Sequence, residues 1–129
     1  MFTVEQIENA HLKVKSGADF PKYIREIKKL GVKGFETWVF DSHTEYIGEK
    51  DFRAKSKPKY DALTISNQID KLTFLTQLKK HQQGKTDYFR FCKDCADTGI
   101  EKWIVNLDEM TCVYYDKNGN EILTEQIPE

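Results

Sequence analysis

Two stretches of the chain carry the same order of helix caps and apolar residues, 68 positions apart (87 − 19 = 68, from Asp19 to Asp87). Each stretch opens on an aspartate, a favoured N-cap, and its helix ends at Gly31 or Gly99, because glycine readily adopts the left-handed C-cap conformation. The residues within and just after these helices agree in type: Phe20, Tyr23, Arg25, Glu26, Val32 and Phe35 align with Tyr88, Phe91, Lys93, Asp94, Ile100 and Trp103. The repeat predicts an internally duplicated α+β fold, in which two αα-βββ units related by a pseudo-twofold axis pack antiparallel hairpins against helices.

Caps and periodicity predict the elements of each unit. Thr3 and Gln6 have capping-box spacing, so the first helix begins there, and Ser16-Gly17 ends it. The other expected helices cover 19–31, 69–83 and 87–99, and the expected strands cover 34–40, 45–47, 62–65, 102–107, 110–115 and 121–127. Asn118-Gly119 joins the last two strands and is the strongest short-range hairpin signal.

The third strand of the first unit departs from the common spacing. Residues 61–64 align with 121–124 at an offset of 60 instead of 68 (121 − 61 = 60), which predicts an eight-residue insertion within a charged loop at 48–60. The basic and aromatic residues of this segment are Phe52, Arg53, Lys55, Lys57, Lys59 and Tyr60. Such a cluster can stack on single-stranded nucleic acid, but acidic neighbours dilute its charge, so we expect a mobile solvated loop.

Length and composition bound the remaining possibilities. A chain of 129 residues is expected to form one domain, with repeat one at about 3–66 and repeat two at about 70–127. A net charge of −1 and a pI near 6.3 argue against a nucleic-acid partner. No apolar run approaches the roughly 18 residues that span a bilayer, and the start shows no signal peptide, so we expect no membrane partner. Three cysteines leave one unpaired, which favours reduced thiols in the cytoplasm.

Cys92 and Cys95 form a C-x-x-C motif that suggests a redox pair or half of a zinc site. A redox pair lies at a helix N-terminus, whereas these cysteines lie a turn or more past the expected cap. The repeat aligns them with Ile24 and Ile27, so we expect small buried apolar residues. Zinc would need further ligands, for which only Cys112 and the histidines are at hand, and we expect no cofactor.

The three histidines differ in their surroundings. His11 lies on the apolar stripe of the first helix and is expected to be a hydrogen-bonded boundary residue, whereas His81 lies near a helix end, where a cation suits the dipole. His43 lies in the first hairpin between Asp41 and Glu45. An imidazole flanked by carboxylates can act as a general base or metal ligand, so these three residues are the catalytic candidates, and a solvated turn is the alternative.

The first hairpin also predicts an aromatic surface. With Ser42-His43 as a two-residue loop, Trp38 lies opposite Ile47 and Phe40 opposite Glu45, on the sheet face away from Val39. The candidate binding or interface residues on this face are Trp38, Phe40, Ile47 and, from the second unit, Tyr115. Another layer of the chain, a ligand or a second subunit must cover this face, and we expect a homodimer.

Four runs of the chain resemble one known family: residues 17–21 (GADFP), 41–46 (DSHTEY), 91–96 (FCKDCA) and 111–116 (TCVYYD). They are similar to a bacterial domain family of unknown function that includes the prophage-borne YbcV protein, often labelled a phage envelope protein. The resemblance covers essentially the whole chain and implies a small cytoplasmic bacterial protein related to phage. It supplies no active-site residues.

Two hypotheses for function follow from these features. The first is a small non-catalytic binding or protein-interaction module, with a small molecule, another protein or a second copy of the chain as its partner. Aromatic anchors supply most interface energy, which favours Trp38 as the contact residue in a homodimer. The alternative is a small hydrolase or metal-dependent enzyme that uses His43, although the chain has no nucleophile elbow, phosphate loop or His-rich metal motif.

Overall fold

A computed structural model describes residues 1–15 and 17–128, and it confirms an α+β architecture. The α-helices are α1 (Val4–His11), α2 (Phe20–Lys29), α3 (Lys71–Gln82) and α4 (Tyr88–Asp97), with short 3-10 turns at Gly17–Asp19 and Glu49–Asp51. The strands are β1 (Gly34–Trp38), β2 (Thr44–Ile47), β3 (Arg53–Lys55), β4 (Ile100–Asn106), β5 (Thr111–Asp116) and β6 (Glu121–Gln126). They form one antiparallel sheet in the order β3-β2-β1-β4-β5-β6.

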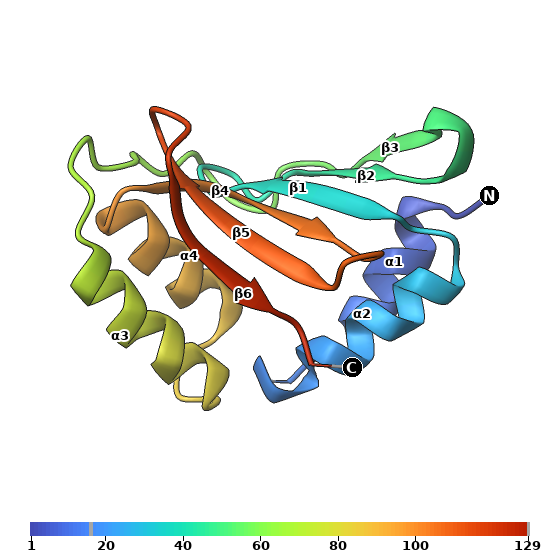
Figure 1. Ribbon diagram of the computed structural model, residues 1–129, viewed down its shortest axis with the longest axis horizontal. Helices are drawn as coiled ribbons and strands as arrows, with labels where there is room; N and C mark the ends of the chain where they lie inside the picture. Colours follow the sequence, from blue (N-terminus) through green and yellow to red (C-terminus); the bar gives the residue numbers. More distant parts are fainter. Residues whose placement is uncertain (16, 129) are drawn as a thin grey trace.

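The helices lie on one face of the sheet as two separate pairs (Figure 1). The pair α1 and α2 lies beneath one end of the sheet, and the pair α3 and α4 lies beneath the other. Helices on one face of an antiparallel sheet leave the other face to solvent, to a ligand or to a partner. We call that second surface, which none of the described helices covers, the helix-free face.

Local capping explains where most helices begin and end. The Thr3 hydroxyl accepts from the Gln6 amide, and the Gln6 side chain accepts from the Thr3 amide, which completes the predicted capping box. Gly31 and Gly99 both have positive φ, which confirms the two predicted helix ends. The Asp87 carboxylate caps α4 by accepting from the Arg90 amide at 2.8 Å.

Asp19 does not cap α2 as predicted. The 3-10 turn Gly17–Asp19 runs directly into the helix, and Asp19 itself has helical backbone angles. Its carboxylate instead accepts from the backbone amide of Lys15 at 2.9 Å. The aspartate therefore fastens the connection between α1 and α2, and the two aligned aspartates serve different local purposes.

The first hairpin has a longer turn than predicted. Gly34, and not Trp38, lies opposite Ile47, and residues 39–43 form the turn between the strands. Phe40 therefore lies in the turn and not opposite Glu45, so both predicted cross-strand pairs are wrong.

The conformation of Ser42 accounts for this difference. Its φ of 60° is left-handed, and its amide donates to the carbonyl of Trp38 at 2.8 Å, which closes the wider turn. The Asp41 carboxylate accepts from the amide of His43 at 2.9 Å. These hydrogen bonds satisfy the turn's backbone without a two-residue loop.

The third strand of the first unit is β3 (Arg53–Lys55), within the segment predicted as a charged loop. Residues 62–65, predicted as a strand, have no regular structure, although Leu63 and Ile65 pack on the core. An edge strand is short and charged because charges discourage pairing with other chains, so it lacks the apolar alternation of an inner strand. Arg53 and Glu121, the first residues of β3 and β6, are 68 positions apart (121 − 53 = 68), so the predicted insertion before the third strand is wrong.

The sheet is arranged around its central pair, β1 and β4. Glu36 lies opposite Ile104, and these two positions are themselves 68 apart (104 − 36 = 68). Two equivalent positions face each other in this way where a twofold axis passes between them. The order of two helices and three strands also occurs twice along the chain. The internal duplication stays a prediction, which superposition of residues 19–47 on 87–115 would test.

The main core lies between the helices and the sheet. Its fully buried side chains include Ile7, Ile24, Ile27, Phe74, Cys92, Cys95, Ile100, Val105 and Leu107. Cys92 and Cys95 are the small buried residues that the repeat predicted, since they occupy α4 where α2 has Ile24 and Ile27. None of the helices in the described part of the chain has the length and apolar composition needed to cross a membrane.

Candidate binding cleft

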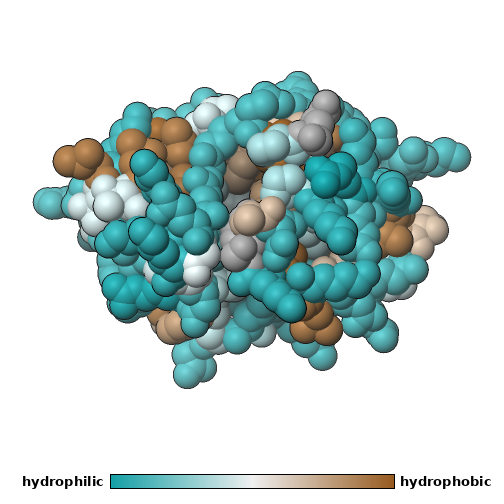
Figure 2. Space-filling view, turned by 90° about the horizontal axis from the view of Figure 1, so that it is seen from below, coloured by the Kyte–Doolittle hydropathy of each residue, from teal (hydrophilic) through white to brown (hydrophobic). Residues whose placement is uncertain are grey.

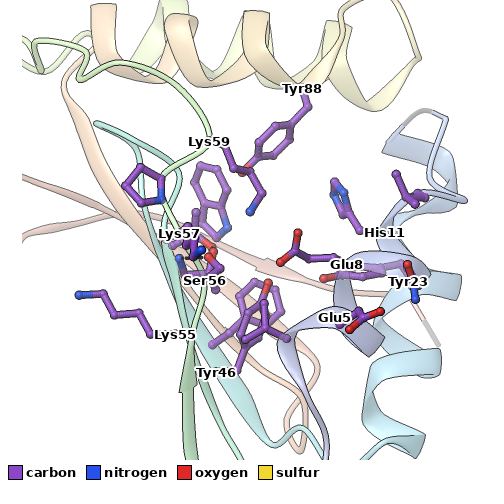
Figure 3. A pocket seen from close by; sticks show the side chains of 18 of the residues that line it. Glu5, Glu8, His11, Tyr23, Tyr46, Lys55, Ser56, Lys57, Lys59 and Tyr88 are labelled. Carbon is purple, nitrogen blue, oxygen red and sulfur yellow. Dashed lines mark hydrogen bonds between the residues drawn. The ribbon is translucent and has the colours of Figure 1, made fainter.

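A cavity of about 810 Å³ opens between α1, the first half of the sheet and residues 55–59 (Figure 3). Helix α1 contributes Glu5, Glu8 and His11 to one wall, and the segment 55–59 forms the opposite wall. The residues that the sheet contributes to the lining are Phe35, Thr37, Thr44, Tyr46 and Trp103. We call this cavity the cleft.

A second cavity, of about 650 Å³, lies next to the cleft on the helical side. Both cavities are lined by His11, Phe20, Tyr88 and Trp103, so these four residues form the boundary between them. The second cavity continues between the two helix pairs, because its other lining residues come from both pairs. Separation of the helical layer into two pairs thus leaves space beneath the middle of the sheet, on its helical face.

The hydroxyl groups of the cleft floor already have partners. The Thr37 and Thr44 hydroxyls are 2.8 Å apart and hydrogen bonded, and the Ser56 hydroxyl accepts from the Thr44 amide at 2.8 Å. Because all three residues are buried, these hydrogen bonds remove the cost of burying their polar atoms. The floor therefore offers mainly the faces and edges of aromatic rings.

Three tyrosines surround the cleft as neutral phenols. Burial and the nearby Tyr46 hydroxyl raise the pKa of Tyr23 far above its ordinary value, and burial raises the pKa of Tyr46 as well. Burial likewise raises the pKa of Tyr88, whose hydroxyl lies 2.6 Å from the Ser42 hydroxyl. None of these phenols supplies a negative charge near neutral pH.

Charged groups of opposite sign face each other across the cleft. Glu8 points inward from α1, and Lys59 points inward from the other wall (Figure 3). The Lys59 ammonium lies 3.4 Å from the carbonyl oxygen of Ser42. Burial lowers the pKa of Lys59, while the carboxylate of Glu8, with Cys92 and Asp41, acts in the opposite direction. Among the described residues, neither Glu8 nor Lys59 belongs to an ion pair.

His11 lies between the aromatic groups of the cleft. Its ring meets Tyr23 and Tyr88 edge to face, with centroid distances of 5.1 and 5.6 Å. Burial lowers the pKa of His11, the charge of Lys59 lowers it further, and Glu8 raises it. No hydrogen bond to the ring is found in the described part of the chain, so the predicted hydrogen-bonded boundary residue is instead held by aromatic packing.

The predicted catalytic triplet is only partly assembled. His43 Nδ1 lies 2.6 Å from Asp41 Oδ1, and both side chains are largely buried. Glu45 instead pairs with Arg53 at 2.6 Å, on the neighbouring strand. The His43 ring is stacked on Trp38 at 6.1 Å with an interplanar angle of 9°. The imidazole is thus in contact with one carboxylate and with the rings of Trp38 and Phe40.

Of the predicted interface residues, Trp38 and Tyr115 lie close together, whereas Phe40 and Ile47 lie elsewhere. Trp38 and Tyr115 flank Lys102, whose Nζ lies 4.7 and 5.6 Å from the two ring centroids. Lys102 also pairs with Glu36 at 3.2 Å. We call these four residues the Lys102 cluster. Phe40 lies in the turn, 37% exposed, and its ring contacts His43 at 5.4 Å.

Ile47, the remaining predicted interface residue, lies apart from the Lys102 cluster. It ends β2 at the strand terminus away from the turn, opposite Gly34 and Arg53. The predicted register placed Ile47 opposite Trp38, but the wider turn shifts the register and places Ile47 opposite Gly34. The structure therefore joins Trp38 and Tyr115 but not Ile47.

The cysteines are buried thiols. Burial raises the pKa of Cys92 and of Cys95, and it raises the pKa of Cys112 to about 12. Such thiols stay protonated and react slowly. Within residues 1–15 and 17–128, no group of three His, Cys, Asp or Glu side chains is arranged to hold a metal ion.

Sequence reasoning missed the residues that define the cleft. Glu8 and His11 are three positions apart in the first helix, and this spacing places them on the same helix face, beside an apolar stripe. That spacing was the available signal. Lys59 carried none, because it was predicted to lie in a solvated loop. Lys59 does lie in an irregular segment and is exposed, and its amide donates to the Asp41 carbonyl at 2.8 Å.

Comparison with known proteins places the chain in a family. Residues 8–126 match the family described as "Protein of unknown function (DUF1398)". The chain belongs to this family. It is similar to the uncharacterized proteins Rv2012 of Mycobacterium tuberculosis (strain ATCC 25618 / H37Rv) and Mb2035 of Mycobacterium bovis, each 23% identical over 99 residues. The matched region is 74% of this DUF1398 chain and 59% of each relative, so the chain spans less than two thirds of the relatives' length.

Proposed function

We propose that this DUF1398 protein is a non-catalytic binding module whose cleft takes a small molecule. The observation that carries the proposal is the cleft itself, which combines about 810 Å³ of space with an aromatic floor and a few inward-facing polar groups. Small-molecule sites have volumes of roughly 300–1,000 Å³, with apolar linings and few convergent polar groups. A site of this kind needs no metal or nucleophile.

The surface around the helices favours a small molecule over a protein partner on this side. Viewed from the helical side, the surface is mainly hydrophilic, and its hydrophobic residues form separate small patches (Figure 2). Protein interfaces are centred on a continuous desolvated patch with aromatic anchors. The aromatic side chains of this region instead line the cleft.

Fluorescence of the two tryptophans tests the proposal, because Trp103 lies in the cleft floor and Trp38 lies on the helix-free face. Trp38→Phe leaves Trp103 as the reporter, and Trp103→Phe leaves Trp38. With 8-anilinonaphthalene-1-sulfonate as an aromatic probe, we expect saturable quenching in Trp38→Phe and little in Trp103→Phe. Quenching of Trp38 alone, or no saturable binding, would contradict a ligand in the cleft.

A hydrolase that uses His43 is the second candidate, favoured by the 2.6 Å contact that orients its imidazole on Asp41. The neighbouring hydroxyl of Ser42 is fully buried and bonded to Tyr88, so a substrate does not reach it without movement of the turn. The test is hydrolysis of a panel of p-nitrophenyl esters and phosphates by the protein and by His43→Ala. Turnover that His43→Ala abolishes would establish the enzyme and overturn the non-catalytic module.

A homodimer through the helix-free face is a separate proposal. Trp38 and Tyr115 are only partly buried there, as expected of aromatic anchors that await a partner. Sedimentation velocity at micromolar concentration should show a dimer that Trp38→Ala weakens, and a monomer would contradict it. The relation to phage and the cytoplasmic location likewise stay proposals, which rest on the family resemblance and on composition.

A further inference from the structure

The two walls of the cleft carry residues of opposite charge. Glu5 and Glu8 belong to α1, whereas Lys55, Lys57 and Lys59 belong to the facing segment. All five residues are exposed, but only some of their charged ends face the cleft: Glu8 and Lys59 point into it, whereas Lys55 points away from it (Figure 3). The opposite charges that face each other across the cleft are therefore those of Glu8 and Lys59.

The walls are held in place by contacts outside the cleft. The Ser56 amide donates to the Thr44 carbonyl at 2.9 Å and the Lys59 amide donates to the Asp41 carbonyl at 2.8 Å, which fastens the lysine wall to β2 and to the turn. Ile7 and Ala10 are buried and fasten α1 to the core. Fixed walls keep Glu8 and Lys59 apart without an ion pair in the described chain, and a site arranged in advance binds with a smaller loss of entropy.

Aromatic side chains occupy the space between the charges. Tyr23, Tyr46 and Trp103 line the inner surface, and His11 stands edge-on to Tyr23. A planar ring makes favourable stacked or edge-to-face contacts with such a lining. Trp103 is 7% exposed, so the ring of a ligand contacts its accessible edge.

We infer that the cleft binds a small aromatic zwitterion, such as an aromatic amino acid, with its ammonium group facing Glu8 and its carboxylate facing Lys59. This inference rests on the proposed function and specifies the class of ligand. Each charged end gains a charge-assisted hydrogen bond to a side chain that has no ionic partner in the described structure. The ring lies among the aromatic side chains, and the neutral phenols add hydrogen-bond donors without adding charge.

Three probes that share one ring test the inference: L-phenylalanine, 2-phenylethylamine and 3-phenylpropionate. They carry both charges, the ammonium only and the carboxylate only. Isothermal titration calorimetry should show L-phenylalanine binding about tenfold more tightly than either single-charge analogue, because each charge-assisted contact contributes on that scale. Equal affinity for all three probes would overturn the inference.

Two variants assign the charges to the two walls. Glu8→Gln should weaken L-phenylalanine and 2-phenylethylamine about tenfold and leave 3-phenylpropionate unchanged. Lys59→Met should weaken L-phenylalanine and 3-phenylpropionate by a similar factor. The matched controls Glu109→Gln and Lys28→Met change exposed residues outside the cleft and should leave all three affinities unchanged. Circular dichroism melts confirm that each variant is folded.

The outcomes separate the inference from the proposed function. If the sulfonate probe quenches Trp103 saturably while L-phenylalanine does not bind, the cleft is a binding site and the zwitterion inference fails. If neither probe binds, both fail. If L-phenylalanine binds but Glu8→Gln and Lys59→Met have no selective effect, the assignment of its charged ends is wrong.

Discussion

The two faces of the sheet carry similar sets of residues in different states. On the helix-free face, Lys102 pairs with Glu36 at 3.2 Å and lies over the rings of Trp38 and Tyr115. These four residues lie on adjacent strands β1, β4 and β5, where the sheet register holds their side chains as cross-strand neighbours. The charges and rings of the Lys102 cluster therefore satisfy one another.

In the cleft, a lysine, a glutamate and a tryptophan stay apart. Lys59 and Glu8 come from an irregular segment and from a helix, with a cavity between them and Trp103 in its floor. No pairing register relates these two elements, so their distance depends on how each packs on the core. The comparison teaches that the same residue types stabilise a fold when neighbouring strands join them and form a potential site when separate layers hold them apart.

The two tryptophans should show the largest difference in stability. Trp103→Ala should lower the free energy of unfolding by about 3–5 kcal/mol, because a buried aromatic side chain leaves a cavity. Trp38→Ala should cost about 1 kcal/mol, since its ring is only partly buried and loses mainly the contacts with Lys102 and His43. Urea denaturation followed by circular dichroism measures both. Equal losses would show that the two faces do not differ as described.

A hydrogen bond between Ser42 and Tyr88 links the turn to the cleft wall, and its loss should have an intermediate effect. Ser42→Ala and Tyr88→Phe should each lower the free energy of unfolding by about 1–2 kcal/mol. Each change removes one of the two hydroxyls and leaves the other hydroxyl buried without its partner. The double variant should cost less than the sum of the two single changes. Strict additivity in a urea double-mutant cycle would show that the two hydroxyls do not interact in solution.

Replacing Lys102 and Lys59 by methionine should change the free energy of unfolding in different ways. Lys102→Met should cost about 0.5–1 kcal/mol, since it removes a partly screened ion pair and two cation-π contacts. Lys59→Met should be neutral or slightly stabilising, because it removes a charge that is only partly desolvated and has no ion-pair partner among the described residues. A clear loss of stability in Lys59→Met would indicate that Lys59 and Glu8 pair in the absence of ligand. If the two residues do pair in this way, Glu8→Gln should lower the stability as well.

The smallest expected effect is the pH dependence from His11. Burial lowers its pKa in the folded chain below 6.5, so the unfolded chain binds more protons as the pH falls through and below 6.5. Stability should therefore decrease with falling pH in this window, by a fraction of about 1.4 kcal/mol per pH unit. His11→Gln should flatten this part of the curve. Burial also lowers the pKa of His81, so this residue accounts for any pH dependence that remains in His11→Gln. His81→Gln should remove that remainder.

Local signals along the chain were sufficient where a few adjacent residues decide the conformation. The capping box of Thr3, the left-handed Gly31 and Gly99, and the Asn118-Gly119 hairpin all occur as predicted. The carboxylate of Asp116 completes that hairpin by accepting from the amides of Asn118 and Asn120. Alternation and helical spacing were also enough to predict an α+β fold with an antiparallel sheet.

Partners that are distant in sequence decided the rest. Arg53–Lys55 becomes a strand because β2 offers its free edge, and the turn at 39–43 widens because Ser42 adopts a left-handed conformation and bonds to Tyr88. Neither cause is visible in the residues concerned.

The sequence by itself determined the helices, the last hairpin and the burial of Cys92 and Cys95, because caps, turns and apolar periodicity act over a few positions. Only the tertiary structure decided that Glu8 and Lys59 face one cavity while Lys102 and Glu36 meet on the opposite face. The physical reason is that a site between layers depends on how separately folded elements pack on a common core. That distance is a property of the whole fold and not of any one segment.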